Sequence, residues 1–322
     1  MQTKNEAISK LNALGAADTP FSFYCDFLGE KWCIEQHLSG SLEASFQLEV
    51  NGESKVPNYT AHEMRFNKKP LAFNDFKAAF DQVVQQINIG NSFLTNLTFQ
   101  TPIETNLSLP EIFQYSSAKY KLIVPDKFVV FSPETFIKIQ DDCIYSYPMK
   151  GTIDAGIPNA EKIILEDIKE IAEHVTIVDL IRNDLSQVAE QVEVTKFRYI
   201  DELVTNNKKL LQVSSEVKGT LQPSWNRNLG TILSKLLPAG SISGAPKQET
   251  LKIIQKAESY NRGFYTGICG HFNGKSLDTG VMIRFIKQAN DQLFYCSGGG
   301  ITSFSLAEKE YQEMVDKVYL AV

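Results

Sequence analysis

The stretch that most constrains the fold of this 322-residue chain is Glu173-His174-Val175-Thr176-Ile177-Val178-Asp179-Leu180-Ile181-Arg182-Asn183-Asp184-Leu185. It lies inside a longer pattern, residues 160–188, whose apolar positions recur at helical spacing, so we expect one long helix there. Glu170 precedes Glu173 by three residues, which places both carboxylates on one face of that helix. Acidic pairs of this kind are common on solvated helices, so the pair alone does not identify a functional site.

A second acidic face follows near the C-terminus. Residues 305–322 have a helical pattern in which Glu310, Glu313 and Lys317 share one face. The order of Glu313 and Lys317 also favours an ordinary i, i+4 ion pair at the surface. If this face and the face of Glu170 and Glu173 converged, their oxygens would suit Mg²⁺, which binds carboxylates and water. Spacing along the chain does not establish that convergence.

Lys150 stands in Ser146-Tyr147-Pro148-Met149-Lys150-Gly151-Thr152, between a strand-like run and a glycine. An amine on such a segment can be held at the edge of a pocket, where desolvation or a nearby cation lowers its pKa and makes it nucleophilic, and this is the functional interpretation of Lys150. Taken alone, a lysine beside a turn is most often a solvated surface charge. The functional interpretation therefore depends on the other segments.

Two glycine-containing segments offer backbone N–H groups that could bind an anion. The first is Gly298-Gly299-Gly300, directly after an apparent strand, although a glycine triplet is more often a flexible turn. The second, residues 240–247, contains Gly244 and leads into a helix N-terminus, and it lacks the spacing of a Walker loop. Arg284 and Tyr265 could add hydrogen bonds to the same anion, or could equally be satisfied at the edge of the core.

Composition limits the class of protein. The 43% hydrophobic and 22% charged residues are typical of a soluble globular protein. No apolar stretch approaches the ~20 residues of a membrane span, and the N-terminus has no apolar targeting segment, so we expect a cytoplasmic protein without membrane contact. Five scattered cysteines predict reduced thiols and give no zinc-ligand spacing. A net charge of -6 with dispersed lysines argues against nucleic-acid binding and favours a small-molecule substrate.

The order of elements predicts one mixed domain over residues 1–322, with a short β-rich N-terminal portion of about residues 1–70. Helices are expected over 73–89, 231–236 and 247–257. Strands are expected over 21–27, 41–50, 92–100, 127–131, 136–147, 263–272, 279–287 and 292–296. Ser132-Pro133-Glu134 predicts a turn between two of these strands. No repeat or low-complexity linker marks a domain boundary.

Several segments together resemble the chorismate-binding enzymes. They are residues 173–185, 240–247, 262–267, 297–301 and 310–317, and the likeness runs in order from about residue 72 to the C-terminus. This family includes anthranilate synthase, aminodeoxychorismate synthase, isochorismate synthase and salicylate synthase. Within it, a lysine in Pro-x-Lys-Gly-Thr marks aminodeoxychorismate synthase component I, whereas anthranilate synthases have alanine there. This chain has Lys150 at that position.

The resemblance implies an α+β fold in which two orthogonal antiparallel-rich β-sheets pack face to face, with helices outside and the active site between the sheets. It implies an enzyme that converts chorismate and ammonia into 4-amino-4-deoxychorismate, on the way to p-aminobenzoate and folate. The ammonia is expected from a separate glutamine amidotransferase subunit, because the synthase domain accounts for this chain.

The resemblance also implies roles position by position. Glu173 and Glu313 would hold Mg²⁺, the implied cofactor, with Glu170 and Glu310 supporting the ion directly or through water. Lys150 would attack carbon 2 of the chorismate ring, and Glu134 would act as general acid for the hydroxyl leaving carbon 4. Other positions would bind the substrate carboxylates or shape the pocket: Tyr265, Arg284, Lys317, Gly244, Gly298, Gly299 and Gly300.

Two positions depart from the family's pattern. Gln212 stands where members usually have a histidine associated with proton handling, including in pyruvate loss, which argues against anthranilate or salicylate formation. Leu94 aligns with the lysine base of the water-adding isochorismate and salicylate enzymes, and a leucine does not activate water. Two alternatives stay open: an anthranilate-synthase-like or isochorismate-type enzyme acting on the same substrate, and a non-catalytic chorismate-binding subunit.

Overall fold

A computed structural model of the chain describes residues 1–37, 45–52, 64–204 and 209–320, and the strands within these ranges form two antiparallel sheets. The ten-stranded sheet contains, in spatial order, β1 (Gln2–Thr3), β3 (Lys31–Gln36), β2 (Phe21–Cys25), β15 (Ile268–Phe272), β16 (Leu277–Val281), β9 (Thr135–Gln140), β10 (Cys143–Ser146), β13 (Lys209–Thr220) and β11 (Met149–Asp154), with β12 (Glu190–Val204) paired to β13. The eight-stranded sheet contains β14 (Gly244–Ala245), β6 (Leu94–Thr105), β18 (Gln292–Ile301), β17 (Phe285–Ala289), β8 (Phe128–Ser132), β7 (Ala118–Val124) and β4 (Gln47–Gly52), with β5 (Phe66–Lys68) paired to β6.

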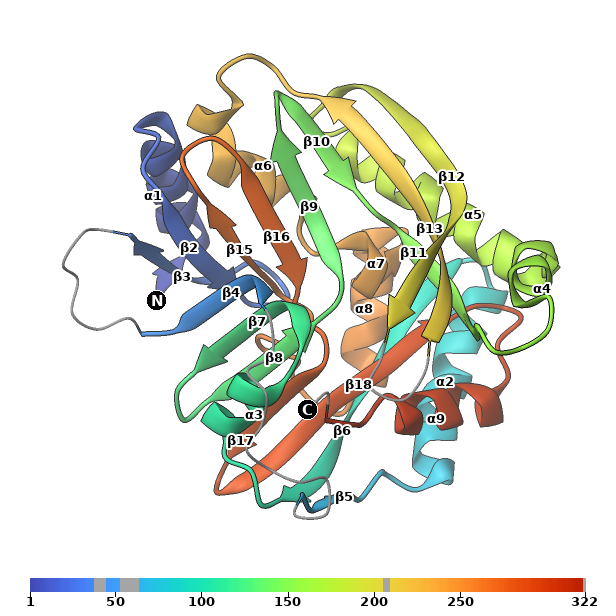
Figure 1. Cartoon of the computed structure of the whole chain (residues 1–322). Coiled ribbons are helices and arrows are strands. Elements are labelled where there is room, and N and C mark those ends of the chain that lie inside the picture. The colour runs from blue at the N-terminus through green and yellow to red at the C-terminus, as the bar shows by residue number, and fades with distance from the viewer. Residues whose placement is uncertain (38–44, 53–63, 205–208, 321–322) are drawn as a thin grey trace.

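Helices cover the outer faces of both sheets (Figure 1). On the ten-stranded sheet, the core includes residues of α1 (Lys4–Ala16), α5 (Ile168–Leu185) and α6 (Leu229–Leu236). On the eight-stranded sheet, separate core clusters include residues of α2 (Phe73–Asn88), α8 (Lys247–Ala257), α9 (Ala307–Asp316) and α3 (Leu109–Tyr115). Short helices α4 (Ala160–Glu166) and α7 (Gly240–Ser243) and a 3₁₀ turn (Trp225–Asn228) complete the described elements. The expected α+β fold of two face-to-face sheets with helices outside is confirmed.

The chain crosses between the two sheets at two places that matter for the site. Residues 133–134 join β8 of one sheet to β9 of the other, and residues 282–284 join β16 to β17 in the same way. Glu134 and Arg284 therefore lie on connections that span the two sheets. The sheets approach closely beside these crossings, since a Cβ at Gly280 would lie 2.4 Å from the ring of the buried Tyr120. Only a glycine permits that contact.

Several sequence expectations need correction. The β-rich N-terminal portion contains β1 to β5, but it also contains α1, whose small residues and Gly15 give a weak helical pattern. The helix expected over 160–188 is two helices, because Asp167 ends α4 and caps α5 by accepting a hydrogen bond from the Glu170 N–H. Of the strand expected over 41–50, residues 41–44 lie outside the described residues, and β4 begins at Gln47.

Three expected strands also differ in extent. The run 136–147 is a hairpin of β9 and β10, because Asp141 and Asp142 have φ of 51° and 56°, the backbone of a tight hairpin turn. The run 279–287 belongs to two strands in different sheets. The run 263–272 forms a strand only from Ile268 onward. Alternation of apolar residues does not distinguish one strand from two strands joined without a break in hydrophobicity.

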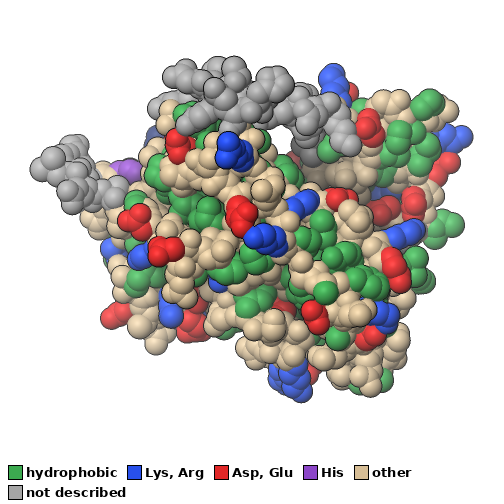
Figure 2. Space-filling model, turned by 90° about the horizontal axis from the view of Figure 1, so that it is seen from below, with side chains coloured by type: hydrophobic (Ala, Val, Ile, Leu, Met, Phe, Trp, Pro, Cys, Tyr) green, Lys and Arg blue, Asp and Glu red, His purple; other side chains and the backbone are tan. Residues whose placement is uncertain are grey.

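Charge is intermixed on the face shown in Figure 2, where Lys and Arg side chains lie among Asp and Glu side chains without forming one continuous basic field. Among the described residues, no helix combines the length and the apolarity needed to cross a bilayer.

Candidate active site

Lys150 lies at an irregularity in β11. Met149 pairs with Ser214 of β13, but the next pair along the ladder joins Thr152 to Gln212. Two residues of β11 therefore stand opposite a single residue of β13, which is a β-bulge. Bulges bend a strand and redirect a side chain, and they are common beside active sites. Gln212, which stands where the family usually has a histidine, therefore lies across the ladder from the segment that carries Lys150.

Gly151 makes this bulge possible. Its φ of +85° is strained for any other residue, and a Cβ there would lie 2.7 Å from Glu170 Oε2 of α5. The bulge brings Lys150 to α5, where its Nζ lies 2.8 Å from Glu173 Oε2. The side chain of Glu173 is 6% exposed and that of Lys150 is 27% exposed, so this ion pair is largely shielded from solvent. Gly151 is therefore needed after Lys150, because it permits the bulge that brings the lysine to Glu173.

The pKa expected for Lys150 is corrected by this pair. Burial lowers the pKa of the amine, as expected from the sequence, but attraction by Glu173, with further attraction by Glu313 and Glu170, outweighs burial. The pKa of Lys150 is therefore raised above its ordinary value. Lys150 is a proton-holding ammonium in this arrangement and must lose its proton before it can act as a nucleophile.

The acidic faces of α5 and α9 converge, which sequence spacing had left undecided. Glu313 of α9 acts electrostatically on Lys150 together with Glu170 and Glu173 of α5. On α9, Lys317 Nζ lies 2.7 Å from Glu313 Oε1, which is the ion pair that the i, i+4 spacing predicted. Thr302, just before α9, donates a 3.5 Å hydrogen bond to Glu173 Oε1 and links the two regions directly.

The glycine triplet lies in a strand and does not form the turn that the sequence indicated. Gly298, Gly299 and Gly300 continue β18 and pair with residues 96–98 of β6. The neighbouring strand β17 ends where Phe285 pairs with Cys296, so β18 has no strand partner on that side beyond Cys296. The triplet is therefore part of a partly open sheet edge.

The direction of the amides on this edge follows from antiparallel geometry. The N–H of Thr98 points away from β18, because it donates to Glu258 Oε1, so Thr98 and Gly298 form a non-hydrogen-bonded pair. The carbonyl of Gly298 accordingly faces the open edge, where it accepts a 2.8 Å hydrogen bond from Lys317 Nζ. By the same alternation, the N–H groups of Gly298 and Gly300 point off this edge, where they can bind an anion.

Close backbone contacts require glycine at Gly298 and at Gly244. A Cβ at Gly298 would lie 2.2 Å from the Leu97 carbonyl oxygen. Gly244, which has φ of +131°, would place a Cβ 2.0 Å from the Leu94 carbonyl oxygen. Gly299 differs, because its Cβ would enter a space bordered by Glu310 Oε2, Glu313 Oε1 and Lys317 Nζ at 3.6–3.7 Å.

Glu134 lies at the crossing between the sheets with two basic groups acting on it. Burial raises the pKa of its carboxyl, and this effect outweighs the hydrogen bond from Ser241 and the charges of Lys317 and Arg284, which lower the pKa. Ser241 Oγ donates a 2.6 Å hydrogen bond to Glu134 Oε1. A carboxyl group that keeps its proton to higher pH is suited to general-acid catalysis.

Arg284 acts on this carboxyl, and Tyr265 in turn lies near Arg284. The Arg284 guanidinium stacks over the ring of Tyr319 at 5.1 Å, and its Nε is buried without a hydrogen-bond partner among the described residues. Tyr265 is 4% exposed and packs against Phe285, and burial raises the pKa of its hydroxyl well above the ordinary value. A buried guanidinium N–H without a partner and a neutral phenol hydroxyl are suited to binding a carboxylate.

Sequence reasoning missed three residues that shape this region. Ser241 and Thr302 lie in or beside quoted motifs, but only the glycines of those motifs were singled out. Arg262 is 4% exposed and pairs with Glu258, and its Nη2 donates to the Asn96 carbonyl. It joins the loop before β15 to β6. The polar residues inside otherwise apolar or glycine-rich motifs were the signal that could have identified them.

The carboxylates fit a divalent cation by chemistry, although within the described ranges no three His, Cys, Asp or Glu side chains form a ready-made metal site. Glu173 and Glu313 both attract the Lys150 ammonium, so their charges already act on a shared cation. The space over Gly299 is bordered by oxygens of Glu310 and Glu313. Carboxylate oxygens with room for further ligands are the donor set that Mg²⁺ takes.

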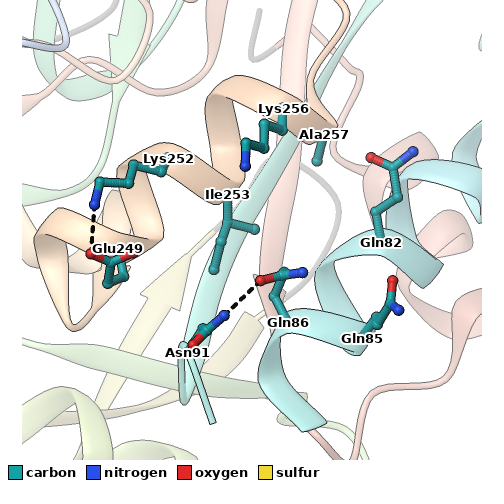
Figure 3. Close-up of a pocket in the computed structure, with 9 residues that line it drawn as sticks. All are labelled: Gln82, Gln85, Gln86, Asn91, Glu249, Lys252, Ile253, Lys256 and Ala257. Atoms are coloured by element: carbon teal, nitrogen blue, oxygen red, sulfur yellow. Dashed lines mark hydrogen bonds and ion pairs between the residues drawn. The ribbon is translucent and has the colours of Figure 1, made fainter. Parts of the chain in front are cut away.

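A surface groove of about 220 Å³ lies elsewhere, between α2 and α8 (Figure 3). Its walls are mainly polar and partly bonded to one another, since Asn91 donates to Gln86 and Lys252 pairs with Glu249. None of the residues expected in the site lines this groove. We therefore place the candidate site around Lys150 and the carboxylates of α5 and α9. Glu134 is linked to them through Lys317, whose charge acts on Glu134 and whose Nζ pairs with Glu313.

Comparison with known proteins identifies the relatives of this chain. A family model described as chorismate binding enzyme matches residues 22–321. An uncharacterized PabA-like protein of Haemophilus influenzae is 47% identical over 99% of this chain and 98% of its own length. The aminodeoxychorismate synthase component 1 of Bacillus subtilis is 29% identical and covers 89% of this chain and 65% of that protein.

Solved structures share the fold. Anthranilate synthase component I from Streptococcus pneumoniae superposes with a TM-score of 0.66 at 26% identity, covering 79% of this chain and 58% of that one. The menaquinone-specific isochorismate synthase of Escherichia coli has a TM-score of 0.74 at 14% identity, covering 98% of this chain and 81% of that one.

Proposed function

This chain belongs to the chorismate-binding enzyme family, and from that premise we propose that it is component I of an aminodeoxychorismate synthase. It would convert chorismate and ammonia into 4-amino-4-deoxychorismate and water. The observation that carries the proposal is the bulge at Lys150, which brings an amine to a cluster of carboxylates. Glu134, an acid of raised pKa, is linked to this cluster through Lys317, whose charge acts on Glu134 and whose Nζ pairs with Glu313. A surface lysine would not need this arrangement.

The reaction proceeds in two substitutions. In the first, the neutral Lys150 amine forms a bond from Nζ to carbon 2 of the chorismate ring, the ring double bonds shift, and the bond from carbon 4 to its hydroxyl breaks. Glu134 gives its proton to that hydroxyl, which leaves as water. In the second, ammonia forms a bond to carbon 4, the double bonds shift back, and the bond between carbon 2 and Lys150 breaks. The amination step releases one proton, which restores the acid.

Substrate binding would use the cationic and amide groups of the candidate site. Arg284 offers its buried Nε, Tyr265 its neutral hydroxyl, and Lys317 its ammonium to the two carboxylates of chorismate. The amides of Gly298 and Gly300 face the same open edge of β18. Gly244 shapes the wall by its backbone contact with Leu94.

The carboxylates would hold Mg²⁺, with Glu173 and Glu313 as ligands and Glu170 and Glu310 in support. When bound, the ion would neutralise the ring carboxylate and compete with Lys150 for Glu173, which removes the attraction that raises the pKa of the amine.

We further propose that the chain acts as a single synthase domain supplied with ammonia by a separate glutamine amidotransferase subunit. The family match over residues 22–321 supports the first part. The relationship to an aminodeoxychorismate synthase component 1 supports the second.

The test is to incubate the purified chain with chorismate, Mg²⁺ and an ammonium salt at mildly alkaline pH, with the Lys150→Ala variant as control. Products are identified by mass and by coupling to an aminodeoxychorismate lyase. We expect p-aminobenzoate only when the lyase is present, and none from the variant. Anthranilate or isochorismate would identify a different enzyme of the family, and binding of chorismate without turnover would identify a non-catalytic subunit.

A further inference from the structure

Glu134 has two carboxyl oxygens, and a second residue contacts one of them. Ser241 Oγ donates a 2.6 Å hydrogen bond to Glu134 Oε1. We propose that Ser241 is a positioning residue for Glu134, because it holds the carboxyl group in the orientation from which the proton is delivered to the leaving hydroxyl. This inference deepens the proposed function and rests on it.

The chemical reason lies in the single proton of each group. The Ser241 hydroxyl has one O–H to donate, and Oε1 accepts it. A hydroxyl that donates to Oε1 favours the proton of the protonated carboxyl group on the other oxygen, Oε2. The hydrogen bond also restricts rotation of the carboxyl group, because turning it out of line with Ser241 Oγ breaks the bond.

Ser241 is itself held firmly, because α7 is anchored on several sides. The Ile242 carbonyl accepts a 2.9 Å hydrogen bond from the buried Arg262 guanidinium. The residue after α7, Gly244, enters the ladder with β6. These contacts give Ser241 a defined position.

The backbone of Glu134 is fixed in the same way. Its carbonyl accepts a 3.0 Å hydrogen bond from the Val281 N–H, and its N–H donates to Ser132 Oγ at 3.2 Å. The crossing between sheets thus holds the main chain, while Ser241, 107 residues away in sequence, holds the side chain. Two independent restraints on one acid indicate a role in orientation.

The charged groups that act on Glu134 are Lys317 of α9 and Arg284 before β17. Both lower the pKa of the carboxyl, as does the hydrogen bond from Ser241, against the opposing effect of burial. Removing the Ser241 hydroxyl leaves the two cations in place and removes only the hydrogen bond. Since that bond stabilises the carboxylate, its loss raises the pKa of Glu134 further.

The experiment compares Ser241→Ala and Ser241→Thr with Ser243→Ala, which removes a hydroxyl from the same helix without touching Glu134. For Ser241→Ala we expect kcat to fall about tenfold or more, with KM for chorismate changed by less than about twofold. The alkaline limb of the rate profile should move to higher pH, because the acid keeps its proton longer. Ser241→Thr should recover most of the rate, and Ser243→Ala should resemble the parent chain.

A second readout does not depend on turnover. A protonated carboxyl group has its own infrared band, and the band of Glu134 is the one that is absent from the Glu134→Gln variant. Following the intensity of this band with pH measures the protonation of Glu134 directly. Its midpoint should rise in Ser241→Ala and stay unchanged in Ser243→Ala. An unchanged midpoint, or an equal loss of rate in Ser243→Ala, would overturn the inference. If the parent chain does not aminate chorismate, the proposed function fails, and the infrared midpoint still decides whether Ser241 controls Glu134.

Discussion

The Lys150→Ala substitution separates the chemical role of the amine from its structural role. In the structure, Lys150 Nζ lies 2.8 Å from Glu173 Oε2, and the Glu173 side chain is 6% exposed. Truncation to alanine removes the nucleophile and leaves a buried carboxylate without its cation. The substitution should therefore abolish amination and also lower stability by a measurable amount.

The size of the stability loss follows from burial. Breaking a fully buried ion pair by removing one partner costs about 3–5 kcal/mol, and exposed pairs contribute about 0–1 kcal/mol. Lys150 is 27% exposed while Glu173 is nearly buried, so an intermediate loss of about 1–3 kcal/mol is expected. For a chain of this size, that is a fall in Tm of roughly 1–5 °C.

A double-mutant cycle measures this interaction. It compares the parent chain, Lys150→Ala, Glu173→Gln and the double variant by urea unfolding at neutral pH. The free energies of unfolding should give a coupling of about 1–3 kcal/mol, because each single variant removes the same ion pair. Circular dichroism before unfolding checks that each variant retains the native fold.

Two results would refute this reasoning. Unchanged amination by Lys150→Ala would rule out the covalent mechanism, since no other residue has been assigned that role. A coupling near zero would show that the Lys150 and Glu173 charges do not stabilise each other in solution. The two measurements are independent, so one part can fail while the other holds.

Three further outcomes are expected. Gly298→Ala should lower the free energy of unfolding by at least about 1–3 kcal/mol, because its Cβ would lie 2.2 Å from the Leu97 carbonyl oxygen, whereas Gly299→Ala makes only 3.6–3.7 Å contacts and should change it by less than about 0.5 kcal/mol in urea melts. Burial, with Arg198, lowers the pKa of His174 from 6.5 to about 4. The contribution of His174 to the free energy of unfolding is therefore complete above pH 6.5 and is lost as the pH falls toward 4, with a loss of roughly 2 kcal/mol at pH 5. A His174→Gln chain should show a flatter dependence of stability on pH. Gln212→Ala should reduce amination less than Lys150→Ala does, and an equal loss of kcat would show that Gln212 has a catalytic role.

Patterns of residues close together in the sequence correctly predicted several individual elements. The helix expected over 73–89 is present as α2, because Phe76, Phe80, Val83 and Ile87 recur at helical spacing and all are buried. The segment that begins at Glu173 lies on a helix, as its periodicity predicted. The chorismate-binding resemblance, carried by residue order and type, is confirmed by the family match. These inferences need only information that is contiguous along the chain.

Tertiary structure alone decided how the elements meet. Glu173 and Glu313 lie on different helices, and both act on Lys150 only because α5 and α9 approach the same bulge of β11. Ser241 reaches Glu134 across 107 residues of sequence. Such contacts depend on packing between distant segments, which helical spacing does not report.

Two local patterns were misleading for the same reason. A glycine triplet taken alone is more often a turn, but pairing with β6 extends this one as a strand. An amine at the edge of a pocket can have a lowered pKa, but carboxylates from two distant helices raise the pKa of Lys150. The sequence by itself determined the family, the main helices and the residue types of the site, because each depends on local order. The tertiary structure decided backbone pairing and the charge around Lys150, because both arise from neighbours brought together by folding.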